Sequence, residues 1–138
     1  MSTYTQIFYQ LVFATRNHEK TLTEDGQESL YKYISGILKN KDCHLYRING
    51  VENHIHIVTH IHPSIALSTL IKDIKLSCTA WNKTNSAFKN FNGWQDGYGA
   101  FTYSIKDKTQ IIIPMLIMNL PKGQFHNIAM VNADRQYV

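Results

Sequence analysis

The chain has 138 residues, which is enough for one domain with a substantial hydrophobic core. Hydrophobic residues make up 43% and charged residues 17%, a balance that excludes an intrinsically disordered chain. The formal net charge of +4 suits a polyanionic partner such as nucleic acid, although it is too modest to require one.

The first half of the chain predicts a strand, a helix and two further strands. Residues 4–14 are aromatic and β-branched with partial alternation, which indicates a strand. Residues 23–27 resemble a helix start, and apolar residues then recur at helical spacing through Leu38. Residues 44–51 indicate a second strand with Asn49 and Gly50 as a turn, and residues 54–61 indicate a third strand.

The second half predicts a helix from Ser64 to Trp81, with Ser64 as its cap and an apolar stripe from Leu67 to Cys78. A loop rich in Asn, Gly and aromatic residues follows over 82–99, and residues 100–105 indicate a fourth strand. Residues 108–119 indicate a last helix, although Pro114 lies inside it. The element order is βαββαβ plus a C-terminal helix. It predicts an α+β ferredoxin-like sandwich, with one antiparallel sheet and helices on one face.

The two cysteines and the hydropathy pattern indicate the cellular compartment in which the protein is expected. Cys43 and Cys78 form no Cys-x-x-Cys motif, so we expect two reduced thiols rather than a disulfide framework or a zinc site. The N-terminal residues lack a signal-peptide pattern, and the longest apolar run, 111–118, is far too short to cross a bilayer. We therefore expect a cytoplasmic protein with no membrane partner.

Four of the seven histidines lie on the predicted third strand or directly after it and share one parity, which is opposite to that of the strand's isoleucines. They are His54, His56, His60 and His62. Alternate side chains of a strand point to opposite faces, so the helices should cover the isoleucine face and the imidazole face should be open to solvent. His54 and His56 have Cα atoms about 6.6 Å apart at ~3.3 Å per residue, which lets both imidazoles reach one divalent ion. By the same rise His60 is about 13 Å from His56.

The histidine pattern alone leaves two interpretations open. His-apolar-His is a three-residue pattern that is common by chance, and a solvated strand face would also carry histidines. A metal site requires a third ligand from elsewhere in the fold.

Four segments resemble the blocks of a known family. "YTQIFYQLVFATRN", "NGVENHIHIVTHIHPS", "LSTLIKDIKLS" and "WQDGYGAFTYS" occur in order from about Tyr4 to Ser104. In sequence and spacing they resemble single-tyrosine transposases of the HUH (histidine, hydrophobic, histidine) nuclease superfamily, including those associated with REP sequences. The resemblance covers about residues 4–104 of a single predicted domain, 1–138, and residues 105–138 form a divergent tail.

The resemblance implies a chemistry and a set of partners. His54 and His56 would help hold Mg²⁺ or Mn²⁺, which polarises the scissile phosphate. A helical tyrosine would attack that phosphate, giving a 5′-phosphotyrosine and a free 3′-OH, and a glutamine one turn later would complete the metal shell. The expected partners are single-stranded DNA with hairpins at the element ends and a second copy of the chain. The expected location is the prokaryotic cytoplasm, at the nucleoid when the protein is bound to DNA.

The chain departs from this family in its tail. The nucleophile position falls at Leu116 or Pro114, the glutamine position falls at Leu120, and Tyr137 is the one tyrosine beyond residue 104. A frameshift just before Pro114 would explain the departure. Codons compatible with residues 113–119, read one nucleotide earlier, encode Ser-Tyr-Val-Asn-Asn-Glu, which is close to the expected motif. The gene sequence tests this hypothesis.

Further residues are candidates for contacts to DNA or to the histidines. Asn53 precedes the first histidine and could orient an imidazole. Basic side chains could meet phosphates, and aromatic ones could stack on an unpaired base, although solvated lysines and aromatic packing are equally ordinary roles. The candidates for DNA contacts are Arg16, Lys72, Lys75, Trp94, Tyr98 and His60.

Three functional hypotheses follow. The first is a transposase that binds hairpin-bearing single-stranded DNA and cuts and rejoins it by metal-assisted phosphoryl transfer. The second is a catalytically inactive, DNA-binding relic of the family that lacks the nucleophilic tyrosine. The third is a small metal-binding ferredoxin-like domain with no role in nucleic-acid biology.

Overall fold

The structure is a computed structural model that describes residues 7–104. Its strands are β1 (Ile7–Ala14), β2 (His44–Val51), β3 (His54–His60) and β4 (Gly99–Ser104). Its helices are α1 (Glu24–Asn40) and α2 (Leu67–Asn85), with a short 3₁₀ turn η1 (Arg16–His18) after β1. The predicted helix at 108–119, with the positions of Pro114, Leu116 and Leu120, lies outside the described residues.

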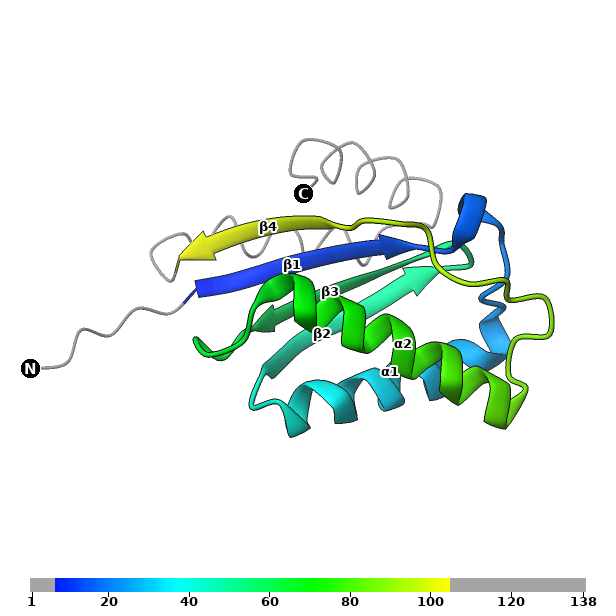
Figure 1. Cartoon of the computed structure of the whole chain (residues 1–138), viewed down its shortest axis with the longest axis horizontal. Helices are drawn as coiled ribbons and strands as arrows, with labels where there is room; N and C mark the ends of the chain where they lie inside the picture. Colours follow the sequence, from blue (N-terminus) through cyan, green and yellow to red (C-terminus); the bar gives the residue numbers. More distant parts are fainter. Residues whose placement is uncertain (1–6, 105–138) are drawn as a thin grey trace, which may run out of the picture.

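The four strands form one antiparallel sheet in the order β2-β3-β1-β4. Both helices pack on the same face of this sheet (Figure 1). The element order βαββαβ, the strand order and the one-sided helices together make the predicted α+β ferredoxin-like sandwich, which is confirmed for the described residues.

The core lies between the sheet and the two helices. α1 contributes Leu30, Ile34 and Leu38, one residue per turn at a spacing of four. α2 contributes the stripe that runs from Leu70 to Cys78, and β3 contributes the predicted isoleucine face. Both cysteines are buried and unbridged, and burial raises the pKa of the Cys78 thiol to about 12. The residues that the sequence assigned to the helix-facing core are therefore where the alternation and the helical spacing placed them.

The turn between β2 and β3 is formed by Glu52 and Asn53, three residues later than predicted. Asn49 and Gly50 are inside β2, where they pair with His56 and Ile55. A Cβ on Gly50 would lie 2.5 Å from the backbone oxygen of His54. The glycine therefore permits a close approach of two strands instead of forming a turn.

The start of α2 is also later than predicted. The helix begins at Leu67 with Ala66 at the cap position, so the prediction that Ser64 caps it is wrong. The Ser64 hydroxyl instead lies 2.6 Å from Nδ1 of His62, within the segment that follows β3. The helix continues to Asn85 and ends at Ser86, whose left-handed backbone (φ 52°) stops it.

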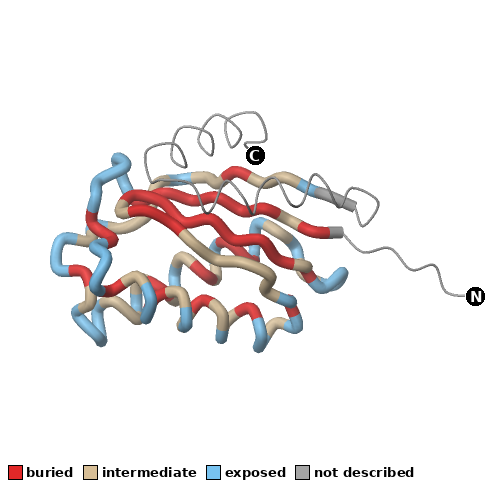
Figure 2. The backbone as a smooth tube through the Cα atoms, turned by 180° about the vertical axis from the view of Figure 1, so that it is seen from behind, coloured by how far each residue is buried: buried red, intermediate tan, exposed pale blue. Residues whose placement is uncertain are grey.

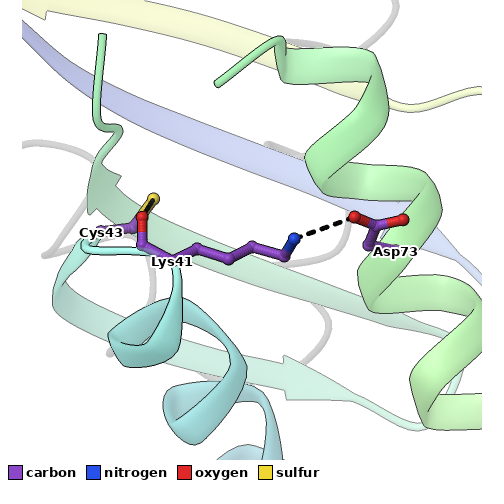
Figure 3. A network of polar contacts seen from close by, with 3 residues as sticks. All are labelled: Lys41, Cys43 and Asp73. Carbon is purple, nitrogen blue, oxygen red and sulfur yellow. Dashed lines mark hydrogen bonds and ion pairs between the residues drawn. The ribbon is translucent and has the colours of Figure 1, made fainter. Parts of the chain in front are cut away.

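A lysine at the end of α1 contacts α2 through an ion pair (Figure 3). Lys41, at the end of α1, donates from Nζ to Oδ2 of Asp73 on α2 at 2.9 Å, and its carbonyl accepts from the Cys43 thiol. Both partners of the ion pair are about one third exposed, so the pair contributes at most about 1 kcal/mol.

The histidine face of the sheet is buried rather than open. His54 and His56 are 0% exposed and Val58 is 1% exposed, although neither α1 nor α2 lies on this face (Figures 1 and 2). The prediction of a solvent-open imidazole face is therefore wrong for this pair. Alternation along a strand fixes which side chains share a face but does not determine whether that face is covered.

Candidate metal centre and nucleic-acid interface

The two histidines of the HUH pattern lie side by side on β3. Their ring centroids are 5.1 Å apart and their planes are inclined at 63°. This separation lets both rings reach one ion at metal–nitrogen distances of about 2.0–2.1 Å. β3 is an inner strand, held by β1 on one side and β2 on the other, so the backbone under the pair is fixed in both directions.

The Asn53 side chain contacts the first histidine. Its Oδ1 lies 2.8 Å from Nδ1 of His54, and its Nδ2 donates to the carbonyl oxygen of His18 at 3.3 Å. Because Oδ1 can only accept, the proton of the His54 ring is on Nδ1. In this form of His54 the Nε2 atom, through which histidines commonly ligate metals, carries no proton.

Gln10 is a neighbour of the second histidine that the sequence analysis did not select. It lies on β1, is 3% exposed, and places its Nε2 atom 3.2 Å from Nδ1 of His56. The signal was present in the sequence, because Gln10 is a polar residue within an otherwise apolar strand and shares a parity with Val12. Antiparallel pairing of β1 with β3 brings that parity beneath the imidazoles.

The loop after β1 forms hydrogen bonds both with Asn53, which precedes the histidine pair, and with the 93–95 segment. Asn17 and His18 both have left-handed backbones, with φ of 54° and 55°, which costs about 1–3 kcal/mol each. Three hydrogen bonds maintain this shape. They run from Thr15 N to Asn53 O, from Arg16 N to Gly93 O, and from Asn17 N to Gln95 Oε1.

A pocket of about 450 Å³ lies where this loop meets α2 and the 93–98 segment. It is lined by five of the six residues proposed for DNA contacts, together with Leu76, which is 60% exposed. The five are Arg16, Lys72, Lys75, Trp94 and Tyr98. Asp96 also lines the pocket and supplies one opposing charge at its rim. The fold therefore gathers residues from three separate segments into one concave, basic and partly aromatic site.

Two of these five side chains also hold the pocket wall together. Lys75 donates from Nζ to the carbonyl oxygens of Gln95 (2.9 Å) and Gly97 (2.8 Å), which leaves one ammonium N–H. Burial lowers the pKa of Lys75, and the nearby Asp96 carboxylate opposes that shift. Trp94 donates from Nε1 to the carbonyl oxygen of Lys75 and packs edge-on against Phe13. Arg16 and Lys72 are exposed and are the cations best placed to meet a phosphate.

His60 lies apart from both sites. It pairs with Phe8 and His44 at the other end of β3 from His54. Its proposed contact with DNA stays a prediction, and such a contact would be separate from the pocket.

The donor set of the pair fits a divalent ion in part. Two imidazoles are present, but within residues 7–104 no group of three or more His, Cys, Asp or Glu side chains is placed to hold a metal. The described part of the chain thus supplies two nitrogen ligands, and the position expected for the third ligand, Leu120, lies outside it. The residues fit a site that is completed from elsewhere.

Two tyrosines near the sheet are poor candidates to replace the missing nucleophile. The Tyr31 hydroxyl is buried near Gly50 on the helix side of the sheet, and burial raises its pKa well above the usual value. A phenol that is harder to deprotonate is a weaker nucleophile. Tyr46 packs edge-on against Phe8 and His44, toward the far end of β3.

Comparison with known proteins identifies the family. Residues 3–114 match the family described as "Transposase IS200 like", which covers most of the chain. The chain belongs to this family. The match extends about ten residues beyond the blocks recognised in the sequence and includes Pro114, one of the two positions at which the tyrosine was expected. No curated protein sequence matches the chain.

Two solved structures share the fold of this IS200-like transposase. A "putative transposase" from Deinococcus radiodurans R1 is 18% identical, with a TM-score of 0.65 over 83% of this chain and 92% of that one. A REP-associated tyrosine transposase bound to a REP hairpin is 15% identical, with a TM-score of 0.60 over 86% of this chain and 72% of that one. At these identities the likeness establishes the fold. Within residues 7–104, neither helix is long and apolar enough to cross a membrane.

Proposed function

We propose that this chain binds hairpin-bearing single-stranded DNA and holds a divalent metal ion, Mg²⁺ or Mn²⁺, between His54 and His56. The observation that carries the proposal is the buried imidazole pair, whose Nδ1 atoms both have side-chain partners. A side-chain partner at Nδ1 orients the ring, as the outer partners of metal-ligating histidines do, and Nε2 would then ligate the ion. Family membership supports DNA as the substrate.

Each part of the site has a chemical task in this proposal. The ion would offset the negative charge of a phosphodiester and make its phosphorus more susceptible to attack. His54 and His56 would hold it, Asn53 would keep His54 in the ligating form, and the buried setting would limit access of water. A homodimer, expected from the resemblance, would allow one protomer to complete the site of its partner.

In this proposal the pocket holds single-stranded DNA near the end of β1 that pairs with His54. Arg16 and Lys72 would contact phosphates, and Tyr98 with the exposed Leu76 would pack against an unpaired base. The strained Arg16–Glu19 loop joins this pocket to Asn53 and so to His54. A single strand bound in the pocket could therefore continue around the end of β1 to the metal.

Two versions of the function differ in whether strands are cut. Family membership favours a transposase that cuts and rejoins DNA through a 5′-phosphotyrosine. The sequence favours a DNA-binding relic, because Leu116 or Pro114 occupies the tyrosine position. The two versions share the metal and DNA sites and differ only in the nucleophile.

One experiment separates these versions and tests the proposal. The full-length chain is incubated with Mn²⁺ and labelled single strands that do or do not end in a hairpin, at several salt concentrations. We expect tighter binding of the hairpin strands than of the other strands. We also expect affinity to fall with salt. In Arg16→Ala and Lys72→Ala, the slope of log affinity against log salt concentration should become less steep by about 0.7 for each lost phosphate contact. Lys32→Ala is the matched control, because Lys32 is exposed on α1 and pairs with Glu28.

The products decide between the two versions. A covalent adduct that survives denaturation supports the cutting enzyme, and binding without an adduct supports the relic. The absence of salt-sensitive binding to any strand would contradict both versions and leave a domain without a role in nucleic-acid biology.

A further inference from the structure

Residues 93–97 form one wall of the pocket, a strap that is attached to the fold on both sides. On one side the strap is tied to the end of β1, because the backbone N–H of Gln95 donates to the carbonyl oxygen of Ala14 at 2.8 Å. On the other side it is tied to α2 by the side chain of Lys75. The strap therefore links the sheet to the helix across the wall of the proposed DNA site.

The ammonium group of Lys75 holds two oxygens of the strap at once. Its Nζ donates to the carbonyl oxygens of Gln95 at 2.9 Å and of Gly97 at 2.8 Å, two residues apart. Gly97 has a left-handed backbone (φ 83°), a conformation that favours glycine and that curves the strap. Hydrogen bonds from a charged donor are about twice as strong as neutral ones. Two of the three N–H groups of the ammonium are thus committed to the strap.

The charge of Lys75 is also engaged within the strap. Asp96, the residue between the two acceptors, interacts electrostatically with the ammonium group and lines the same pocket. The other two cations of the pocket wall, Arg16 and Lys72, are exposed, whereas Lys75 is half-buried. Lys75 therefore has less charge and fewer donors to offer a phosphate than either of its neighbours.

The contact with Gly97 also bears on the residue that follows it. Tyr98 lies between Gly97 and Gly99, where β4 begins and pairs with Val12 of β1. Its backbone is therefore held on both sides, by Lys75 before it and by the sheet after it. Because the proposed function has Tyr98 pack against an unpaired base, loss of the Lys75 contact would release one side of that aromatic wall.

We infer that Lys75 is a positioning residue that pre-forms the DNA pocket by holding the strap, and that the phosphate contacts fall to Arg16 and Lys72. This inference rests on the proposed function of the pocket. A loop that is already held in its binding conformation loses less conformational entropy when the ligand binds. Lys75 therefore strengthens DNA binding through the strap rather than through its own charge.

The partner of Lys75 Nζ in the DNA complex distinguishes positioning from a phosphate contact. In full-length protein labelled with ¹⁵N and ¹³C, scalar couplings across hydrogen bonds connect Nζ either to a carbonyl carbon or to a DNA phosphorus. We expect couplings from Lys75 to the carbonyl carbons of Gln95 and Gly97 both before and after a hairpin-ended single strand is added. A coupling to phosphorus that replaces them in the complex would overturn the inference.

Substitution of Lys75 provides the second measurement. Lys75→Met keeps a long aliphatic side chain but has no donor, and it should weaken binding of the hairpin-ended strand by about tenfold. Lys75→Arg keeps both charge and donors and should recover most of that loss. Lys83→Met, which alters an exposed lysine of the same helix, is the matched control and should bind as the unmutated chain does. Equal affinity of Lys75→Met and the unmutated chain would overturn the inference.

The salt dependence of binding removes the remaining ambiguity. The double variant Lys75→Met/Asp96→Asn has the net charge of the unmutated chain. Its affinity should fall, while the slope of log affinity against log salt concentration should stay the same. A slope that is less steep by about 0.7 would show the loss of a phosphate contact and would overturn the inference.

Failure of the proposed function gives a different result from failure of this inference. If the unmutated chain shows no salt-sensitive binding to any strand, the proposed function is wrong. The role of Lys75 in holding the strap is then tested in the free protein by amide hydrogen exchange. Lys75→Met should speed exchange at the Gln95 amide by about tenfold, and unchanged exchange would contradict that role.

Discussion

Asn53 uses the two ends of a single amide to connect the first histidine to a strained loop. Its acceptor faces His54 and its donor faces His18, which has a left-handed backbone. The sequence could predict the first role, because Asn53 directly precedes the histidine. It could not predict the second, because His18 is brought close only by the pairing of β1 with β3.

Substitution of Asn53 separates its two roles. Asn53→Ala removes the acceptor for His54 Nδ1–H and should weaken Mn²⁺ binding by about 10–100-fold. Asn53→Asp keeps an acceptor and should bind within a few-fold of the unmutated chain. Isothermal titration measures both, with the exposed Asn90→Ala as a control. Equal weakening in Asn53→Ala and Asn53→Asp would show that the loop contact, and not the imidazole, is what matters.

At the scale of elements, periodicity identified the helices and strands but not the fine positions of their ends. Helical spacing from Leu30 to Leu38 placed α1 correctly, since apolar burial of one stripe dominates helix formation. Asn49-Gly50 was taken for a turn because that dipeptide favours turns, whereas the fold uses the glycine for close strand contact. At such positions tertiary packing, and not the local turn propensity, determines the backbone structure.

Two glycines in α1 offer an internal comparison. Gly36 has open space around it, so Gly36→Ala should raise the free energy of unfolding by about 0.5–1 kcal/mol through better helix propensity. At Gly26 a Cβ would lie 2.6 Å from Cε1 of the buried Phe88 ring, so Gly26→Ala should lower it by about 1–3 kcal/mol.

Urea unfolding followed by circular dichroism measures both glycine changes. The expected signs are opposite, although the substitutions are chemically identical and lie on the same helix. The same sign for both would show that the Phe88 ring does not exclude a side chain at position 26 of α1. The side-chain amide of Asn82 donates to the backbone oxygen of Phe88 and accepts from its backbone N–H, which is why the ring cannot easily shift.

At the scale of the whole molecule, the order of the elements was sufficient to predict the fold. The alternation of apolar residues in the strands and two amphipathic helices leave few arrangements other than a one-sided α+β sandwich. The candidate site was only half predictable. His54, His56 and Asn53 are adjacent in sequence, whereas Gln10 and the burial of the imidazole face depend on contacts between distant segments.

The pocket illustrates the same limit. Its basic and aromatic residues are scattered from Arg16 to Tyr98, and each had an ordinary alternative role in the sequence. The fold brings them together near the end of β1 that pairs with His54 of β3. It also shows that Lys75 and Trp94 stabilise the wall, which no pattern in the sequence indicated.

The most direct test of the account is to detect which nitrogens bind the metal. Electron spin echo modulation of Mn²⁺ added to the full-length chain reports directly coordinated imidazole nitrogens. We expect two in the unmutated protein, one in His56→Gln and two in the control His62→Gln, which alters an exposed histidine beyond β3. Bound Mn²⁺ with no imidazole nitrogen in the unmutated chain, or an unchanged signal in His56→Gln, would contradict the assignment of His54 and His56 as the metal site.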